Sequence, residues 1–164
     1  MTSQKRLSND FGRGLTQKVV LSLLNLNQKA TDEVVKCDTS DFDIFKLREY
    51  TDGNELVSLL PFVLARRNVL GRTELDINKL IRFAFKIQTG YKNITYHNKT
   101  HGADLCQTIN YFFVQGQLGV KAKIDEHEYL AMLTAACVHD FEHPGVNNVF
   151  LVKMQNPIAI RHND

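Results

Sequence analysis

The chain has 164 residues, of which 43% are hydrophobic and 23% are charged, and its formal net charge is +2. These proportions are ordinary for one folded domain, and so small a net charge gives no argument for binding to nucleic acid or to a membrane surface. The longest apolar run, near LVSLLPFVLA, contains a serine and a proline. It falls far short of the roughly 20 residues of a membrane-spanning helix, so we expect no transmembrane segment.

The N-terminal residues and the cysteines predict an intracellular, cytoplasmic protein. The opening MTSQKRLSNDFGRG lacks the apolar core of a signal peptide. The three cysteines, Cys37, Cys106 and Cys137, are few, odd in number and widely spaced, which favours reduced and buried thiols. A homo-oligomer is compatible with the sequence, which does not decide the oligomeric state.

The N-terminal half of the chain shows helical hydrophobic spacing. Residues 14–28 predict an amphipathic helix, and the polar stretch 27–41 is typical of a linker. The stretch FDIFKLREY predicts a short helix. In the apolar segment that follows, Asp52 and Glu55 have capping-box spacing. There, Pro61 predicts a kink or a break near residue 60, and Gly71 can end the helix.

The second half of the chain predicts helices as well. Asp76 is the expected N-cap of a helix that stops at Gly90. Its expected core face consists of Ile77, Leu80, Ile81, Ala84, Phe85 and Ile87. A loop at 91–97 precedes a helix expected from about Asn98 to Gln115.

Two more helices complete the expected order. Asp125 and Glu128 form a second capping box, which opens a helix that is apolar nearly all round and therefore expected to be buried. The stretch NNVFLVKMQ predicts a further helix that ends before Pro157. Because no segment has convincing strand character, the sequence predicts an all-α fold.

Histidines and acidic residues gather in two places. In YHNKTHGAD, His97 and His101 are four residues apart and so share a helix face. Taken alone, that pair is more typical of exposed surface histidines. In HDFEHPG, His139 and Asp140 end an apolar helix, because Pro144 and Gly145 stop it there. They either mark the helix end as polar residues or need a partner, since buried ionisable groups are costly unless paired or metal-bound.

Together these residues predict a metal site. His101, His139 and Asp140 are the candidate ligands, with His97 and His143 nearby. Two imidazoles and one carboxylate suit zinc or another borderline divalent ion. Three protein ligands leave a position open for water, as in catalytic sites, and a carboxylate can bridge to a second metal. Paired metals of this kind suit attack on phosphorus.

The motif YHNKTHGADL, followed after a helical spacer by HDFEHPGVNNVFL, resembles the class I cyclic nucleotide phosphodiesterases. The stretches FDIFKLREYTDGNELV and KIQTGYKNITYHN are also similar to that family's catalytic domain. The resemblance covers roughly residues 40–164. It implies hydrolysis of cAMP and/or cGMP to the nucleoside 5′-monophosphate, with a cyclic nucleotide as substrate and no nucleic acid as partner.

The resemblance also implies roles for individual residues. His101, His139 and Asp140 match ligands of a tightly held metal, usually Zn²⁺, and Asp140 would bridge to a second metal, usually Mg²⁺ or Mn²⁺. His97 matches the general acid that protonates the leaving O3′ of the cyclic phosphate. His143 would hydrogen-bond the metal-bound water.

Two more positions match the family motif. Tyr96 would line the phosphate region, and Asn148 would make a structural contact that orients the loop after the HPG turn. One position departs from the family motif: Gly102 stands where the family usually has alanine. The glycine is expected to weaken the helix that follows Asn98 by up to about 1 kcal/mol.

The family has a further metal-ligating aspartate and a purine-clamping glutamine downstream of the segment that corresponds to the end of this chain. We therefore expect residues 1–39 to form an N-terminal helix and linker, and residues 40–164 to form part of a truncated catalytic domain. Little or no turnover is expected from residues 1–164 alone. The alternatives are another HD-type metal phosphohydrolase and a catalytically inactive short form.

Overall fold

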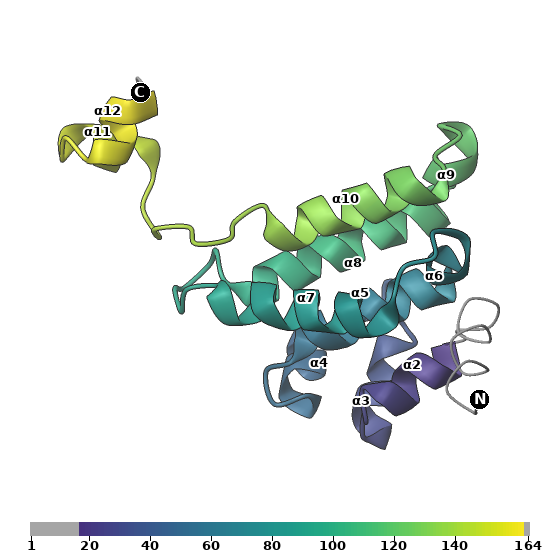
Figure 1. The fold of residues 1–164 in the computed structure, drawn as a ribbon. Helices are drawn as coiled ribbons and strands as arrows, with labels where there is room; N and C mark the ends of the chain where they lie inside the picture. Colours follow the sequence, from purple (N-terminus) through teal and green to yellow (C-terminus); the bar gives the residue numbers. More distant parts are fainter. Residues whose placement is uncertain (1–16, 163–164) are drawn as a thin grey trace, which may run out of the picture.

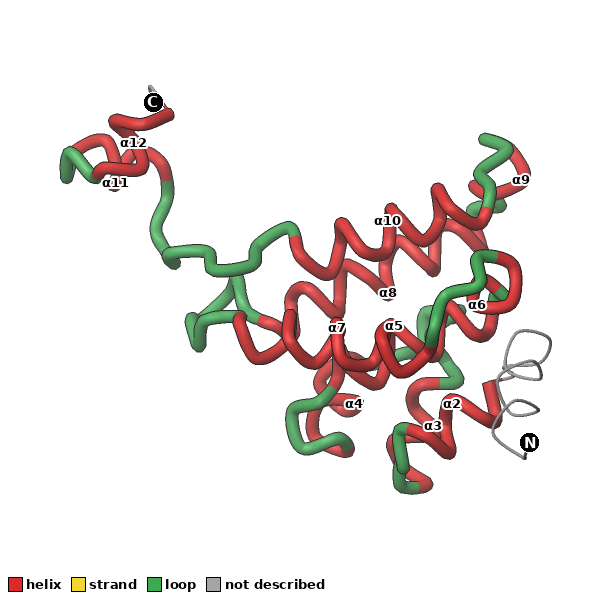
Figure 2. The backbone as a smooth tube through the Cα atoms, viewed as in Figure 1, coloured by secondary structure: helices red, strands yellow, loops and turns green. Residues whose placement is uncertain are grey.

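The computed structural model describes residues 17–162 of the chain. Within that range every regular element is a helix, which confirms the all-α prediction (Figures 1 and 2). The helices are α2 (Gln17–Leu23), α3 (Gln28–Val34), α4 (Ile44–Tyr50), α5 (Glu55–Arg66), α6 (Val69–Arg72), α7 (Ile77–Gly90), α8 (Lys99–Gln115), α9 (Leu118–Lys121), α10 (Glu126–Val138), α11 (Asn148–Lys153) and α12 (Pro157–His162). None of these described helices is both long enough and apolar enough to cross a membrane.

Helix α5 lies at the centre of the bundle and contacts α2, α7 and α8. Its sequence has no polar stripe, and residues 55–65 are all buried. The helix contains Pro61 without a break and ends at Arg66, because Asn68 adopts a left-handed conformation with φ of 56°. The expected end at Gly71 is therefore wrong.

The capping box expected before α5 is also wrong. The N-cap is Asn54, and its side chain makes no capping hydrogen bond. Glu55 is instead fully buried and accepts a hydrogen bond of 2.7 Å from the hydroxyl of Thr100 on α8. This carboxylate therefore joins two helices of the core, a role that its spacing from Asp52 does not reveal.

The N-terminal part differs from the prediction of one helix and a linker. Helix α2 ends at Leu23, and Asn25 follows with φ of 49°. Asn27 then caps α3, because its Oδ1 accepts a hydrogen bond of 2.9 Å from the amide of Ala30. The polar stretch expected to be a linker thus contains a helix, whose buried residues Ala30 and Val34 join the core. Residues 14–16 of the expected helix lie outside the described residues, and the domain boundary near residue 40 stays a prediction.

The caps expected for α7 and α10 are confirmed, as is the expected start of α8 near Asn98. Asp76 caps α7, Asn98 caps α8, and Asp125 forms a complete capping box with Glu128 at the start of α10. One position on the expected core face of α7 is wrong, because the side chain of Phe85 is 54% exposed.

Helix α10 is not buried all round. Its buried residues are Tyr129, Leu133, Ala136 and Cys137, which form one stripe. That stripe faces α8, which runs beside α10 (Figure 1). Ala131 and Ala135 on another face are exposed. Part of the apolar surface of α10 is therefore left uncovered by the described elements.

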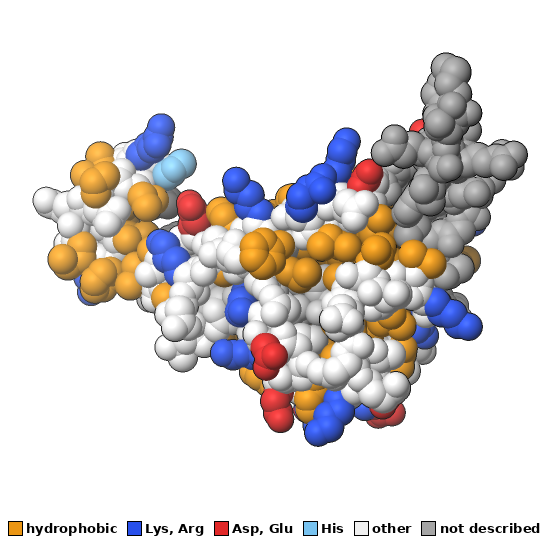
Figure 3. Space-filling model, turned by 60° about the horizontal axis from the view of Figure 1, so that its bottom comes forward, with side chains coloured by type: hydrophobic (Ala, Val, Ile, Leu, Met, Phe, Trp, Pro, Cys, Tyr) orange, Lys and Arg blue, Asp and Glu red, His pale blue; other side chains and the backbone are white. Residues whose placement is uncertain are grey.

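Helices α11 and α12 contact each other and form a lobe beyond the end of α10 (Figure 1). The lobe carries exposed hydrophobic side chains, namely Val149, Phe150, Val152, Met154, Ile158 and Ile160. Figure 3 shows them gathered at one end of the molecule, with a further hydrophobic band across the main body. Apolar patches of this kind are typical of surfaces that bind other protein, and a homo-oligomer stays a prediction.

A buried polar network joins α8, α10 and the segment after α3. Asn110 is completely buried, and its Nδ2 donates hydrogen bonds of 2.9 Å to the carbonyl oxygen of Cys37 and to the carboxylate of Asp38. Its Oδ1 accepts a hydrogen bond of 2.7 Å from the hydroxyl of Tyr129. All three cysteines are buried and unpaired, as the sequence predicted.

We expect Asn110→Ala to lower the free energy of unfolding by about 2–3 kcal/mol, because it leaves the buried Tyr129 hydroxyl unpaired and opens a cavity. Gln115→Ala is the matched control: Gln115 also donates to this segment, at 2.7 Å to the carbonyl oxygen of Asp38, but Gln115 is exposed. Its loss should cost about 1 kcal/mol or less. Urea unfolding of both variants measures the difference, and equal losses would contradict the prediction.

Candidate metal centre and active site

The site forms where the start of α8 meets the end of α10. His101 lies in the first turn of α8, and His139 follows the last residue of α10. Because the two helices pack side by side, residues 38 positions apart in the sequence bring their rings together. Asn98 fixes the start of α8, since its side chain accepts hydrogen bonds from the amides of Thr100 and His101.

His101, His139 and Asp140 form the group that we call the trio. Nε2 of His101 lies 3.2 Å from Nε2 of His139 and 3.3 Å from Oδ2 of Asp140. Nε2 of His139 lies 2.9 Å from the same carboxylate oxygen. A tetrahedral zinc ion with bonds of about 2.0–2.1 Å separates its ligand atoms by about 3.3 Å. The donor atoms of the trio therefore already have the spacing that such an ion needs, and the predicted ligands are brought together.

The ring of His139 is held by the helix that precedes it. Its Nδ1 lies 2.8 Å from the carbonyl oxygen of Ala136. A carbonyl oxygen can only accept, so Nδ1 carries the proton and the neutral ring directs the lone pair of Nε2 toward the rest of the trio. A metal-binding histidine is usually oriented in this way by a partner on its other nitrogen.

The surroundings of His101 favour its neutral imidazole. Burial, together with the neighbouring ring of His139, lowers the pKa of His101, while Asp140 acts in the opposite direction. Metal binding requires deprotonated ligands. His101 is therefore in its metal-binding form at lower pH than an exposed histidine would be.

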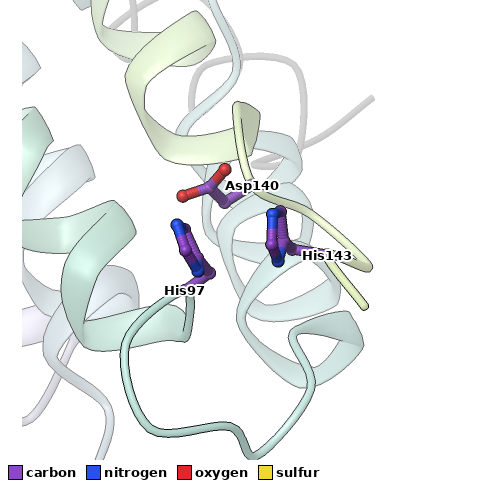
Figure 4. Close-up of side chains that lie close together, drawn as sticks. All are labelled: His97, Asp140 and His143. Atoms are coloured by element: carbon purple, nitrogen blue, oxygen red, sulfur yellow. The ribbon is translucent and has the colours of Figure 1, made fainter. Parts of the chain in front are cut away.

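A second group shares Asp140. The possible ligand atoms of His97, Asp140 and His143 all lie within 4.8 Å of one another. The rings of His97 and His143 stack with a centroid distance of 3.9 Å and an interplanar angle of 23° (Figure 4). His97 comes from the loop before α8 and His143 from the loop after α10. The carboxylate of Asp140 belongs both to this second group and to the trio.

The hydrogen bonding of His143 distinguishes it from the trio. Its Nδ1 accepts a hydrogen bond of 3.0 Å from the amide of Gly145, which has a φ of 80°. The proton of the neutral ring is then on Nε2, so that nitrogen is a donor. A donor at this place can bind an anion or a water oxygen, but it cannot ligate a metal until it loses its proton. This arrangement fits a hydrogen-bonding role better than a ligand role.

Two predicted residues lie at the edge of the site. Tyr96 is 63% exposed. The centroid of its ring lies 4.6 Å from the ring centroid of His101 and 4.9 Å from that of His97. Asn148 is exposed at the start of α11, and the loop contact expected from it stays a prediction. Oδ1 of Asn147 accepts a hydrogen bond of 2.9 Å from the amide of Phe150 and so caps α11.

The prediction missed Tyr91, which lies in the loop before α8. Its hydroxyl donates a hydrogen bond of 2.8 Å to the carbonyl oxygen of Cys137, two residues before His139. Nothing in the sequence near Tyr91 indicates this contact, because its partner is 46 residues away.

The donor set fits divalent metal ions. Among residues 17–162, two overlapping groups each bring two imidazoles and a carboxylate together, and the trio is the one of the two whose hydrogen bonding fits a ligand role. In the trio, the hydrogen bond to Ala136 leaves Nε2 of His139 with a lone pair free for a metal.

Comparison with known proteins points to one family. Residues 96–164 match the family described as 3′5′-cyclic nucleotide phosphodiesterase. The chain is 35% identical over 125 residues to 3′,5′-cyclic-AMP phosphodiesterase 4 of Dictyostelium discoideum, a match that covers 76% of this chain and 12% of that protein. It is also 35% identical over 126 residues to the human dual specificity calcium/calmodulin-dependent 3′,5′-cyclic nucleotide phosphodiesterase 1B, covering 75% of this chain and 23% of that protein.

A solved structure, that of LmjPDEB1 in complex with IBMX, shares the fold. The TM-score is 0.70 at 24% identity, and the match covers 84% of this chain and 44% of that one. The chain thus spans less than a quarter of the length of these two curated relatives. From the family match, the identity to the relatives and the shared fold, the chain belongs to the class I cyclic nucleotide phosphodiesterase family and carries part of its catalytic domain.

Proposed function

We propose that this chain supplies the general acid and the first metal site of an enzyme that hydrolyses 3′,5′-cyclic nucleotides, cAMP and/or cGMP, to nucleoside 5′-monophosphates. One observation carries the proposal: the carboxylate of Asp140 belongs both to the trio and to the group that contains the stacked rings of His97 and His143. A candidate metal-binding group and a candidate proton donor then share one carboxylate, an arrangement that supports cleavage of a phosphate ester.

The trio would hold the tightly bound ion, with Zn²⁺ the metal that suits its donors, and Asp140 would extend to a second ion, Mg²⁺ or Mn²⁺. When bound, such ions neutralise charge on phosphate and lower the pKa of water. The imidazoles of His101 and His139 would supply lone pairs to the ion. The hydrogen bond from Nδ1 of His139 to the carbonyl oxygen of Ala136 keeps the lone pair of its Nε2 directed toward the rest of the trio.

The protein groups around the trio would handle protons and the phosphate. His97 would hold the proton that the leaving O3′ takes up, since an alkoxide is a poor leaving group without it. His143 would donate from Nε2 to an oxygen near Asp140, because the amide of Gly145 occupies its Nδ1. The exposed ring of Tyr96 would bound the phosphate region next to His97 and His101.

Hydrolysis of cAMP and cGMP by the protein that contains this chain tests the proposal. We expect turnover to be lost on treatment with a chelator and restored by Zn²⁺ together with Mg²⁺. A panel of noncyclic phosphate monoesters serves as the control, since another HD-type phosphohydrolase would prefer them. Turnover that survives metal removal, or hydrolysis of the monoesters alone, would contradict the proposed function.

A further inference from the structure

The end of α10 is held by three specific donors. The last carbonyl groups of a helix lack partners within it and must find them elsewhere. The carbonyl oxygen of Ala136 accepts a hydrogen bond from the ring of His139, and the carbonyl oxygen of Val138 accepts one of 2.9 Å from the amide of Phe141. The carbonyl oxygen of Cys137 accepts a hydrogen bond from the hydroxyl of Tyr91. Only the last of these donors comes from another part of the fold, so Tyr91 ties this turn to the rest of the molecule.

Tyr91 is well placed to hold this turn still. It follows the end of α7 and is 9% exposed. Its ring packs edge to face on that of Phe141, with a centroid distance of 6.0 Å and an interplanar angle of 79°. Burial raises the pKa of Tyr91 to about 12, so its hydroxyl stays protonated and remains a donor at neutral pH. Residues 137–141, which include two members of the trio, are thus contacted by Tyr91 at both ends.

The neighbouring helix leaves room for this hydroxyl. Gly102 follows His101 on α8, and a Cβ added to it would lie 2.7 Å from the hydroxyl oxygen of Tyr91. Any larger residue would make the hydroxyl move. Gly102 therefore has a packing role beyond the small loss of helix stability that the sequence indicated.

We propose that Tyr91 is a positioning residue of the metal site, which sets the directions of His139 and Asp140 by binding the carbonyl of Cys137. The inference rests on the proposed function only in so far as the trio binds metal. The hydroxyl touches none of the donor atoms of the trio and acts through two residues of backbone. Its loss should therefore alter how well the ligands are aligned and leave their number unchanged.

The variant Tyr91→Phe removes only the hydroxyl. With residues 1–164 and Co²⁺ as a spectroscopic substitute for Zn²⁺, we expect about a 10–100-fold loss of metal affinity and a changed visible spectrum. Tyr129→Phe is the matched control: it also removes a buried hydroxyl with a hydrogen bond of 2.7 Å, but one that lies in the network of Asn110. It should leave the Co²⁺ affinity and spectrum unchanged.

A second variant guards against a general loss of structure. Gly102→Ala should displace the hydroxyl and weaken Co²⁺ binding in the wild-type background, but much less in the Tyr91→Phe background. In the metal-free protein, the ¹⁵N shifts of the His139 ring should change in Tyr91→Phe and stay unchanged in Tyr129→Phe. Failure of the wild-type chain to bind Co²⁺ would refute the metal site itself. Wild-type binding with an unaltered Tyr91→Phe spectrum and affinity would refute only the positioning role.

Discussion

Replacing Asp140 with alanine is expected to abolish tight zinc binding by residues 1–164. Its Oδ2 lies within 3.3 Å of the Nε2 atoms of both His101 and His139, and it is the carboxylate common to both candidate groups. Loss of a partner outside the metal's own ligands costs about 10–100-fold in affinity, so loss of the charged ligand should cost more than 100-fold. Competition with a chromophoric chelator measures the affinity directly.

Two further variants show whether the geometry or only the charge is responsible. Asp140→Asn keeps the size of the side chain and removes its charge, so it should bind zinc poorly as well. His143→Ala is the control, because His143 belongs only to the second group, and it should keep tight zinc binding. Wild-type affinity in Asp140→Ala, or an equal loss in His143→Ala, would show that the trio is not the tight site.

Replacing His97 with asparagine is expected to lower kcat for cyclic nucleotides by about 10²–10⁴-fold in the protein that contains this chain. The reason is that O3′ of a ribose must be protonated as it leaves, and His97 is the candidate donor beside Asp140. His97 lies outside the trio, so zinc affinity should be retained. Steady-state kinetics together with the zinc titration separate these two effects.

An activated substrate makes this second test sharper. A p-nitrophenyl phosphodiester has a leaving group that departs without a proton, so His97→Asn should affect its hydrolysis far less. Tyr96→Phe is a useful companion, because it changes the neighbouring ring without removing an acid. If His97→Asn slowed both substrates equally, its role would be structural or metal-related and the assignment as general acid would fail.

The elements that the sequence predicted best are those whose determinants are local. Asp76 and Asp125 each cap a helix through amides two or three residues away, so the spacing alone identifies them. Helix α3 was missed because its polar residues suggested exposure. Glu33 is only 2% exposed, since it accepts hydrogen bonds from Lys36 and from the amide of Asp43. Such tertiary partners are invisible in hydrophobic spacing.

In the site, too, local patterns were predicted and contacts that depend on tertiary packing were not. The residue types and the four-residue spacing of the histidines predicted which side chains form the trio. The hydrogen bond from His139 to Ala136, which fixes the proton on one ring nitrogen, depends on side-chain torsions that no pattern specifies. The contact of Tyr91 with Cys137 depends on how α7, α8 and α10 pack. Sequence reasoning therefore predicted which side chains come together here and not how they are aligned.

The single carboxylate shared by the two groups has a consequence for the way ions exchange with solution. Among residues 17–162, one negative charge serves both groups, and the other donors there are imidazoles. A first divalent ion already exceeds that charge, so a second meets electrostatic repulsion a few ångströms away. Residues 1–164 should accordingly retain one ion through desalting and release the other within the dead time of the column. The more loosely held ion would then have to be present in the buffer throughout an assay.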